Sequence, residues 1–219
     1  MATEDDERAG HKANLDRLLA LSDGVFAVAI TLLVLDIRVP TQASGHLLTA
    51  LLQNLSSVQS YIISFAVIGI YWNAHRGILH SVQRFDGALA ALNLLFLFFI
   101  AFLPVPTAIL GQYGNSLTAT IVYALSMVLV GICSFLLWWY ISADYRLLDA
   151  TIDRHSIVSH SAQILIPPLV FLLSIGVAFI NIFAPAVPGP QLAQYFWLLI
   201  AVLQFAQGRW WRVHRGDTE

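Results

Sequence analysis

The sequence predicts an all-α integral membrane protein with six transmembrane helices in each subunit. Hydrophobic residues make up 58% and charged residues only 11% of the 219-residue chain, whereas a soluble domain is about 25% charged. The mean hydropathy of +0.73 is also high. The apolar residues gather in six long segments, and each must be a helix because a segment in lipid has to satisfy its backbone hydrogen bonds internally.

The six segments have lengths suited to crossing ~30 Å of bilayer hydrocarbon. We expect them at residues 20–37, 54–73, 87–110, 116–141, 157–183 and 191–208. Turn residues occupy the connectors 40–45, 111–115 and 184–190. The third span carries Pro104 and Pro106 at its far end, and Pro167-Pro168 predicts a kink or a break inside the fifth.

The first span is unusual because ionisable residues lie near both ends of its apolar core. Only twelve residues separate Asp23 from Asp36, which is about 18 Å of helix and too short to cross the bilayer. A helix over about residues 16–39 would cross it with Asp23 inside. A carboxylate there costs roughly 2.5–3.5 kcal/mol on insertion scales, so this helix should face protein or water.

The distribution of cations predicts the orientation. Ten of the 11 Lys and Arg residues fall on one side of the predicted membrane, and only Arg38 falls on the other. The positive-inside rule then places both termini in the cytoplasm. We expect a polar N-terminus over residues 1–16, without the cleavage site of a signal peptide, a six-helix transmembrane domain over 17–209, and a cytoplasmic tail over 210–219.

Several functional classes find no support in the sequence. No basic patch is dense enough to suggest nucleic acid binding. The single Cys133 excludes an internal disulfide framework and lies in an apolar run, where an inert buried thiol is expected. His75 and His80 are five residues apart and do not share a helix face, so no metal site is predicted. We find no nucleophile–base pair or phosphate-binding glycine loop, and we expect neither an enzyme nor a cofactor.

Two motifs carry a resemblance to a known family. The run Arg17-xxx-Leu21-Ser22-Asp23 and the apolar residues after it resemble the first-helix signature of the transmembrane protein 175 family of potassium channels. The family motif has Phe where this chain has Leu21. The second span is also similar to the family at Trp72-Asn-x-His75. The six-span layout matches one family repeat over nearly the whole chain.

The resemblance implies a potassium-selective channel in a bacterial cell membrane, with a homotetramer whose first helices line a pore on the oligomer axis. It also implies that Val28, Leu32 and Leu35 are the pore constrictions and that Thr31 lies beside them. The three apolar residues share one helix face, because their spacing is i, i+4, i+7. Stacked apolar rings can gate a pore by dewetting, although an apolar stripe at this spacing also fits ordinary packing. Gly111-Gln-Tyr-Gly114 superficially resembles a carbonyl filter but lacks the preceding residues, and we interpret it as a turn.

The ionisable residues of the first two spans have two interpretations. In the first, Arg17 and Asp23 belong to a network that holds the pore helix, with partners among Ser22, Trp72, Asn73 and His75. In the second, they make ordinary charge pairs near the cytoplasmic interface, where Arg17 can snorkel.

Two further polar residues, Asp36 and Asn93, lie within the predicted spans. Asp36 could concentrate cations at the outer mouth, or it could balance the charge of Arg38. Asn93, in the third span, is expected to hydrogen-bond a neighbouring helix.

One alternative function uses the same residues in a different way. A proton-coupled secondary transporter would employ Asp23 and His75 as relay groups. Against it, the chain shows no internal repeat and few intramembrane carboxylates. The expected partners are therefore the lipid bilayer, potassium as the permeant ion, and further copies of the same chain.

Overall fold

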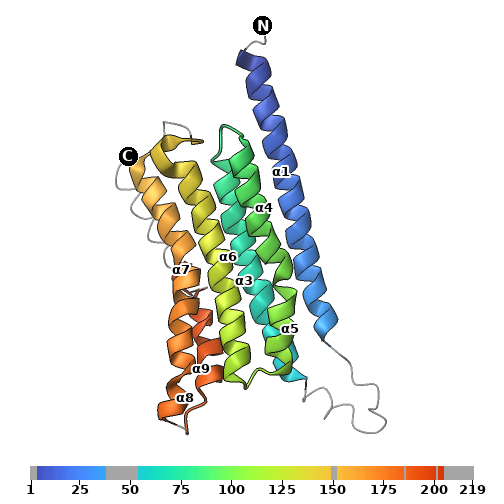
Figure 1. The fold of residues 1–219 in the computed structure, drawn as a ribbon, viewed down its shortest axis with the longest axis vertical. Coiled ribbons are helices and arrows are strands. Elements are labelled where there is room, and N and C mark those ends of the chain that lie inside the picture. Colours follow the sequence, from blue (N-terminus) through green and yellow to red (C-terminus); the bar gives the residue numbers. More distant parts are fainter. Residues whose placement is uncertain (1–3, 38–53, 149–151, 185, 201, 205–219) are drawn as a thin grey trace.

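The computed structural model describes residues 4–37, 54–148, 152–184, 186–200 and 202–204. These residues form a bundle of helices that run side by side along one long axis (Figure 1). The all-α class is confirmed. Four described helices, counting α4 and α5 as one, are long and apolar enough to cross a membrane: Leu55–His80, Gly87–Gln112, Leu117–Tyr145 and Arg154–Ala178.

The first helix begins much earlier than predicted. Helix α1 spans Glu4–Leu33 and continues as a 3-10 turn, η1, over Val34–Asp36. Its first turns project beyond the other helices (Figure 1). The prediction of a start near residue 20 was wrong because it followed hydrophobicity. A helix pairs its own backbone groups, so charged residues can extend it into water.

The second and third predicted spans form three helices. Helix α3 spans Leu55–His80, two turns beyond the predicted end. Helix α4 spans Gly87–Phe102 and is capped by Asp86, whose carboxylate accepts from the Leu89 amide at 2.8 Å. Helix α5, Pro104–Gln112, follows after Leu103. The predicted single span is divided there because proline lacks an amide hydrogen, while its fixed φ suits a first helical turn.

The fifth span keeps its helix through two prolines. Helix α7 is assigned without interruption over Arg154–Ala178, so a break at Pro167-Pro168 is wrong. Proline at position 167 leaves the carbonyl of residue 163 without its usual helical donor. In the structure, the Gln204 side-chain amide donates to the Gln163 carbonyl at 3.0 Å. A donor from another part of the chain thus compensates for the missing hydrogen bond.

The remaining elements complete the bundle. Helix α6 spans Leu117–Ser142 and ends in a 3-10 turn, η2, over Ala143–Tyr145. Helix α8 spans Ile180–Phe183, and α9 spans Gly189–Phe196. Helical residues recur at 198–200 and 202–204, within the predicted sixth span. The rest of that span, the tail over 210–219 and the connector 40–45 lie outside the described residues. Of the predicted turn Gly111-Gln-Tyr-Gly114, the first two residues belong to α5, and the chain turns only at residues 113–115.

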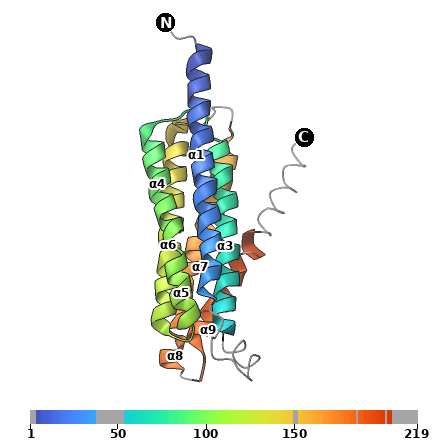
Figure 2. The ribbon, with the colours of Figure 1, turned by 90° about the vertical axis from the view of Figure 1, so that its right-hand side faces the viewer.

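The core lies along α6. Tyr123, Met127, Val130, Leu137 and Ile141 are all completely buried on this helix. Helices α4, α5, α7 and α9 surround it. Helix α1, in contrast, lies on the outside of the bundle, over α3 and α4 (Figure 2).

Two faces of the first helix and a polar cluster

Helix α1 has one face inside the bundle. Its side chains at Ser22, Phe26, Ala29 and Leu33 are at most 2% exposed. Their spacing of three and four residues places them on one side of the helix. Phe26 contacts the ring of Phe96 on α4, with centroids 5.9 Å apart. This face holds α1 against its own subunit.

A second face of α1, about 120° around the helix from the first, is apolar and uncovered in the subunit. Leu21, Val28, Leu32 and Leu35 are 48%, 57%, 41% and 72% exposed. The first three line a shallow groove of about 450 Å³ that reaches Ala101. The structure therefore places the three predicted constriction residues on the exposed side of α1.

Thr31 also lies on the exposed side of this helix. Its hydroxyl lies 3.0 Å from the Ala27 carbonyl and 2.9 Å from the Val28 carbonyl. The single hydroxyl proton is thus directed to the helix backbone. The oxygen lone pairs remain as acceptors for an ion or for water.

A polar cluster joins α1 to its two neighbours. The Trp72 indole of α3 donates to the Asp23 carboxylate at 2.8 Å. The Asn93 amide of α4 donates to the Ser22 hydroxyl at 3.1 Å, and that hydroxyl donates to the Leu18 carbonyl at 2.8 Å. Asn93 thus bonds a neighbouring helix, as expected. Consecutive residues of α1 are fixed to two different helices.

His75 lies beside this cluster in an apolar environment. The side chain is 1% exposed, and its ring stacks on Phe96 with centroids 4.8 Å apart. Phe26 lies on another side at 5.8 Å. Neither ring nitrogen has a hydrogen-bond partner within the part of the chain that the structure describes. Asp23 and His75 are therefore not joined directly as a relay would require.

Other predicted site residues are not brought together. Arg17 and Asn73 are exposed, and no ion pair links Arg17 to Asp23. The cation near Trp72 is instead Arg76, whose guanidinium lies 5.7 Å from the centre of the indole ring. Asp36 ends the 3-10 turn, and its side chain is not among those described.

A second polar cluster was not anticipated from the sequence. The Ser64 hydroxyl of α3 lies 2.9 Å from both the Thr107 hydroxyl of α5 and the Tyr123 hydroxyl of α6. All three side chains are buried. Isolated polar residues inside apolar spans were the available signal, since buried hydroxyls in a membrane protein find partners on neighbouring helices.

The bundle resembles that of a known potassium channel. The crystal structure of a lysosomal potassium-selective channel TMEM175 homolog from Chamaesiphon minutus superposes with a TM-score of 0.69 at 32% identity, covering 86% of this chain and 98% of that chain. The fold is thus that of an integral membrane ion channel.

The sequence comparisons specify which channel family this is. A potassium channel of Streptomyces collinus is 39% identical over 170 residues, which cover 75% of this chain and 82% of that protein. One of Chamaesiphon minutus is 34% identical over 194 residues, covering 86% and 96%. The family profile described as endosomal/lysosomal potassium channel TMEM175 matches residues 17–104. The chain belongs to the TMEM175 family and is a potassium channel.

Proposed function

We propose that potassium crosses the membrane passively through a central pore lined by the α1 helices of four identical subunits. The observation that carries this proposal is the division of α1 into two faces. One face packs inside the subunit, whereas Leu21, Val28, Leu32 and Leu35 are exposed on the other. In four copies around an axis, this second face would surround the ion path.

We infer four subunits from helix dimensions and symmetry. One subunit offers a single α1, and one helix cannot enclose a water path. Closed cyclic symmetry supplies identical helices around an axis. Two or three helices about 10 Å wide leave almost no lumen at contact distance, whereas four leave a narrow lumen that Val or Leu side chains can occlude.

The apolar side chains would set the conductance. We propose that Val28 forms the narrowest ring, that Leu32 and Leu35 lie above it toward the outside, and that Thr31 lies beside them. A hydrophobic constriction gates by dewetting. An ion that passes it sheds water without replacement ligands, and potassium holds its water less tightly than sodium. Asp36 would lie near the outer mouth.

The polar cluster would hold the pore helix in position. The bonds of Asp23 to Trp72 and of Ser22 to Asn93 fix α1 to α3 and α4. The contacts of His75 with Phe26 and Phe96 support a packing role rather than a proton relay. We therefore favour passive conduction over coupled transport.

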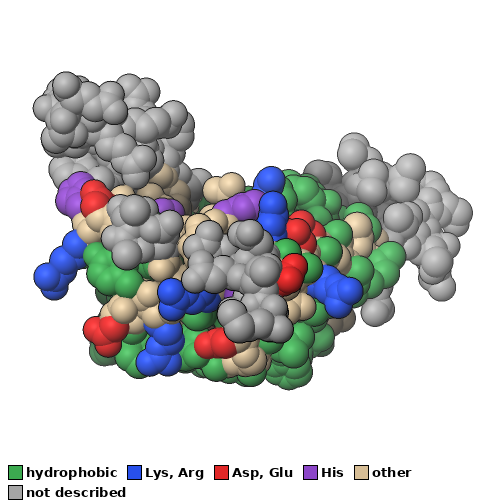
Figure 3. Space-filling view, turned by 90° about the horizontal axis from the view of Figure 1, so that it is seen from above, with side chains coloured by type: hydrophobic (Ala, Val, Ile, Leu, Met, Phe, Trp, Pro, Cys, Tyr) green, Lys and Arg blue, Asp and Glu red, His purple; other side chains and the backbone are tan. Residues whose placement is uncertain are grey.

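We also propose that the protein lies in a bacterial cell membrane with both termini in the cytoplasm and six spans per subunit. Figure 3 shows charged side chains and histidines at the end of the bundle from which α1 projects. The cation distribution along the sequence supports the same orientation. Cysteines introduced at Thr3 and Thr218 should not be labelled by impermeant thiol reagents added outside intact cells. Labelling of both from outside would contradict the proposed orientation.

A permeability measurement tests the pore-lining face. We expect Val28→Asn to raise sodium permeability relative to potassium. The amide makes the ring polar, so that hydrated ions should be able to pass. The reversal potential in mixed potassium and sodium reports this ratio. Val158→Asn on α7 is the matched control, since Val158 is 58% exposed and Val28 is 57% exposed. An unchanged ratio in the Asn variants of Val28, Leu32 and Leu35 would place the pore elsewhere.

Native mass spectrometry in detergent tests the stoichiometry. We expect the mass of four chains. A monomer or dimer that still conducts potassium would contradict both the tetramer and the pore on its axis.

A further inference from the structure

Arg17 lies on the same side of α1 as the proposed pore face. Counted at ~100° per residue, Leu21 lies about 20° and Leu32 about 40° from the direction of Val28. Arg17 lies about 20° from that direction, and α1 is continuous between these positions. Asp23, which binds Trp72, lies about 140° away. Helix geometry thus separates Arg17 from Asp23 and aligns it with the pore face.

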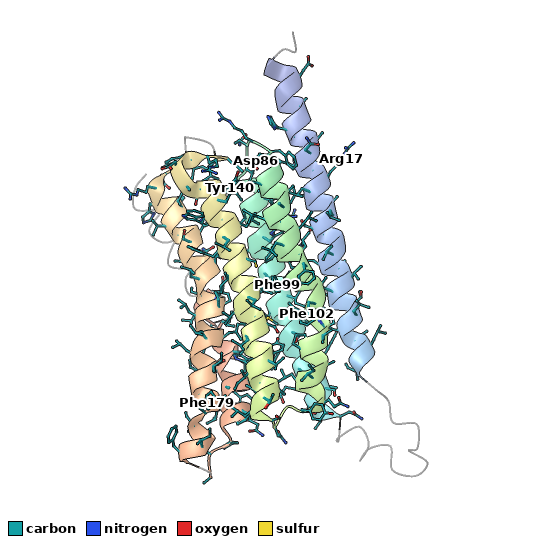
Figure 4. The ribbon with its side chains drawn as sticks, in the orientation of Figure 1. Arg17, Asp86, Phe99, Phe102, Tyr140 and Phe179 are labelled. Atoms are coloured by element: carbon teal, nitrogen blue, oxygen red, sulfur yellow. The ribbon has the colours of Figure 1, made fainter. Side chains whose placement is uncertain are left out.

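The side chains next to Arg17 on its own face of α1 carry no charge. The side chain is exposed and lies on the side of α1 that faces away from the other helices (Figure 4). No carboxylate within the described residues forms an ion pair with it. The nearest acidic neighbour on the helix, Asp16, lies about 100° away around the axis. The residues one helical turn before and after Arg17 are uncharged; they include Ala13, Asn14 and Ala20.

We propose that four copies of Arg17 form a cationic ring at the cytoplasmic mouth, which binds multivalent phosphate and so blocks potassium entry. This site rests on the proposed tetrameric pore, because one subunit supplies only one guanidinium. Arg17 lies about 16 Å from Val28 along the helix. The ring is therefore in the aqueous entrance, well away from the apolar constriction.

The chemistry of the ring selects this ligand class. Four like charges around a narrow axis repel one another and raise the local concentration of anions. A linear triphosphate carries several charges and presents oxygens to more than one guanidinium. Arginine forms two parallel hydrogen bonds to a phosphate, which lysine cannot do. A bound phosphate on the axis would obstruct the potassium path.

The competing source of phosphate is the membrane itself. If Arg17 faced lipid, its guanidinium would bind phospholipid headgroups and would respond to the anionic lipid content of the bilayer. On the pore axis, the ring is reached only from the cytoplasm. The two placements therefore predict opposite dependences on soluble phosphate and on lipid.

The experiment records potassium currents of the full-length channel in bilayers of neutral phosphatidylcholine, with inorganic triphosphate added to one side at a time. We expect triphosphate to inhibit from the cytoplasmic side only. In Arg17→Gln the inhibitory concentration should rise at least about tenfold, since several charge-assisted hydrogen bonds are lost. Arg17→Lys should have an intermediate effect, because it keeps the positive charge but loses the planar guanidinium that forms two parallel hydrogen bonds.

The matched control removes one charge from the opposite side of the same helix. Lys12 is exposed and lies about 160° from the direction of Val28. Lys12→Gln should leave the inhibition unchanged. Thermal unfolding of all variants verifies folding, and Arg17→Lys keeps the test decisive if Arg17→Gln fails to assemble.

Two results would overturn the ring. The first is equal inhibition of the wild type and both Arg17 variants by triphosphate. The second is a current that ignores triphosphate but changes with phosphatidylglycerol content in an Arg17-dependent way. Failure of the tetrameric pore itself would appear separately, as an unchanged permeability ratio in the Val28, Leu32 and Leu35 variants.

Discussion

Helices α1 and α6 both contain long apolar runs, but these runs are covered in different ways. Helix α6 lies in the middle of the bundle, and half of its most apolar window is buried inside the subunit. Helix α1 buries one stripe and exposes Leu21, Val28, Leu32 and Leu35. The comparison shows that hydrophobicity alone does not identify a core helix. The uncovered apolar face of α1 must meet something outside its subunit.

The two helices also differ in their charges. Helix α6 contains no Asp, Glu, Lys or Arg, whereas α1 carries Asp23 within its predicted span and Arg17 just before that span begins. Charged residues in a membrane helix are costly and generally face protein or water. Here, Asp23 meets Trp72, and Arg17 lies on the exposed side. The ionisable residues therefore mark the helix that is not simply part of the core.

The largest expected effect tests which face of α1 is inside the subunit. Phe26→Ala should lower the free energy of unfolding by about 3–5 kcal/mol, because it removes a buried ring and leaves a cavity. Phe26 is 2% exposed and contacts both Phe96 and His75. Val28→Ala on the exposed face should cost much less. Thermal unfolding in detergent measures both, and equal losses would contradict the division of α1 into two faces.

Replacing a glycine by alanine should affect stability differently in the two helices. A Cβ at Gly131 of α6 would lie 2.5 Å from the Cβ of Pro168 on α7, whereas a Cβ at Gly24 of α1 would meet nothing within 4 Å. Gly131→Ala should therefore destabilise by ~1–3 kcal/mol. Gly24→Ala should be neutral or should stabilise the helix by up to about 1 kcal/mol. The shift in unfolding temperature is the measurement, and a stabilised Gly131→Ala would show that the α6–α7 contact is looser than described.

The smallest expected effect concerns the bond between Asp23 and Trp72. In a double-mutant cycle with Asp23→Asn and Trp72→Phe, we expect a coupling energy of about 1 kcal/mol, because the carboxylate is charged but exposed. This is less than the cost of breaking a fully buried pair. Unfolding of the two single variants and the double variant gives the coupling. A value of zero would show that the bond does not hold α1 to α3.

The sequence was most informative about α1. The Arg17-xxx-Leu21-Ser22-Asp23 motif identified the family, and the spacing of Val28, Leu32 and Leu35 predicted a shared face. Both depend on local order along one helix, where the 3.6-residue period relates sequence directly to geometry. The predicted start of α1 was wrong, because hydrophobicity marks the apolar layer of the membrane, whereas the helix extends into polar residues.

Contacts between distant residues could not be read in the same way. The bond of Asn93 to Ser22 joins residues 71 positions apart, and the cluster of Ser64, Thr107 and Tyr123 joins three helices. Composition reveals that these side chains need partners, but many pairings would satisfy them. The choice depends on how the helices are rotated against one another.

By itself, the sequence determined that the chain is an α-helical membrane protein, because a long apolar segment in lipid can satisfy its backbone groups only as a helix or in a closed barrel. It also determined which residues share a face of α1. Only the tertiary structure decided which face is buried, that Trp72 rather than Arg17 meets Asp23, and that α7 continues through Pro167-Pro168 with help from Gln204. Each of these depends on a contact between helices, and such contacts are set by the packing of the whole bundle rather than by the order of neighbouring residues.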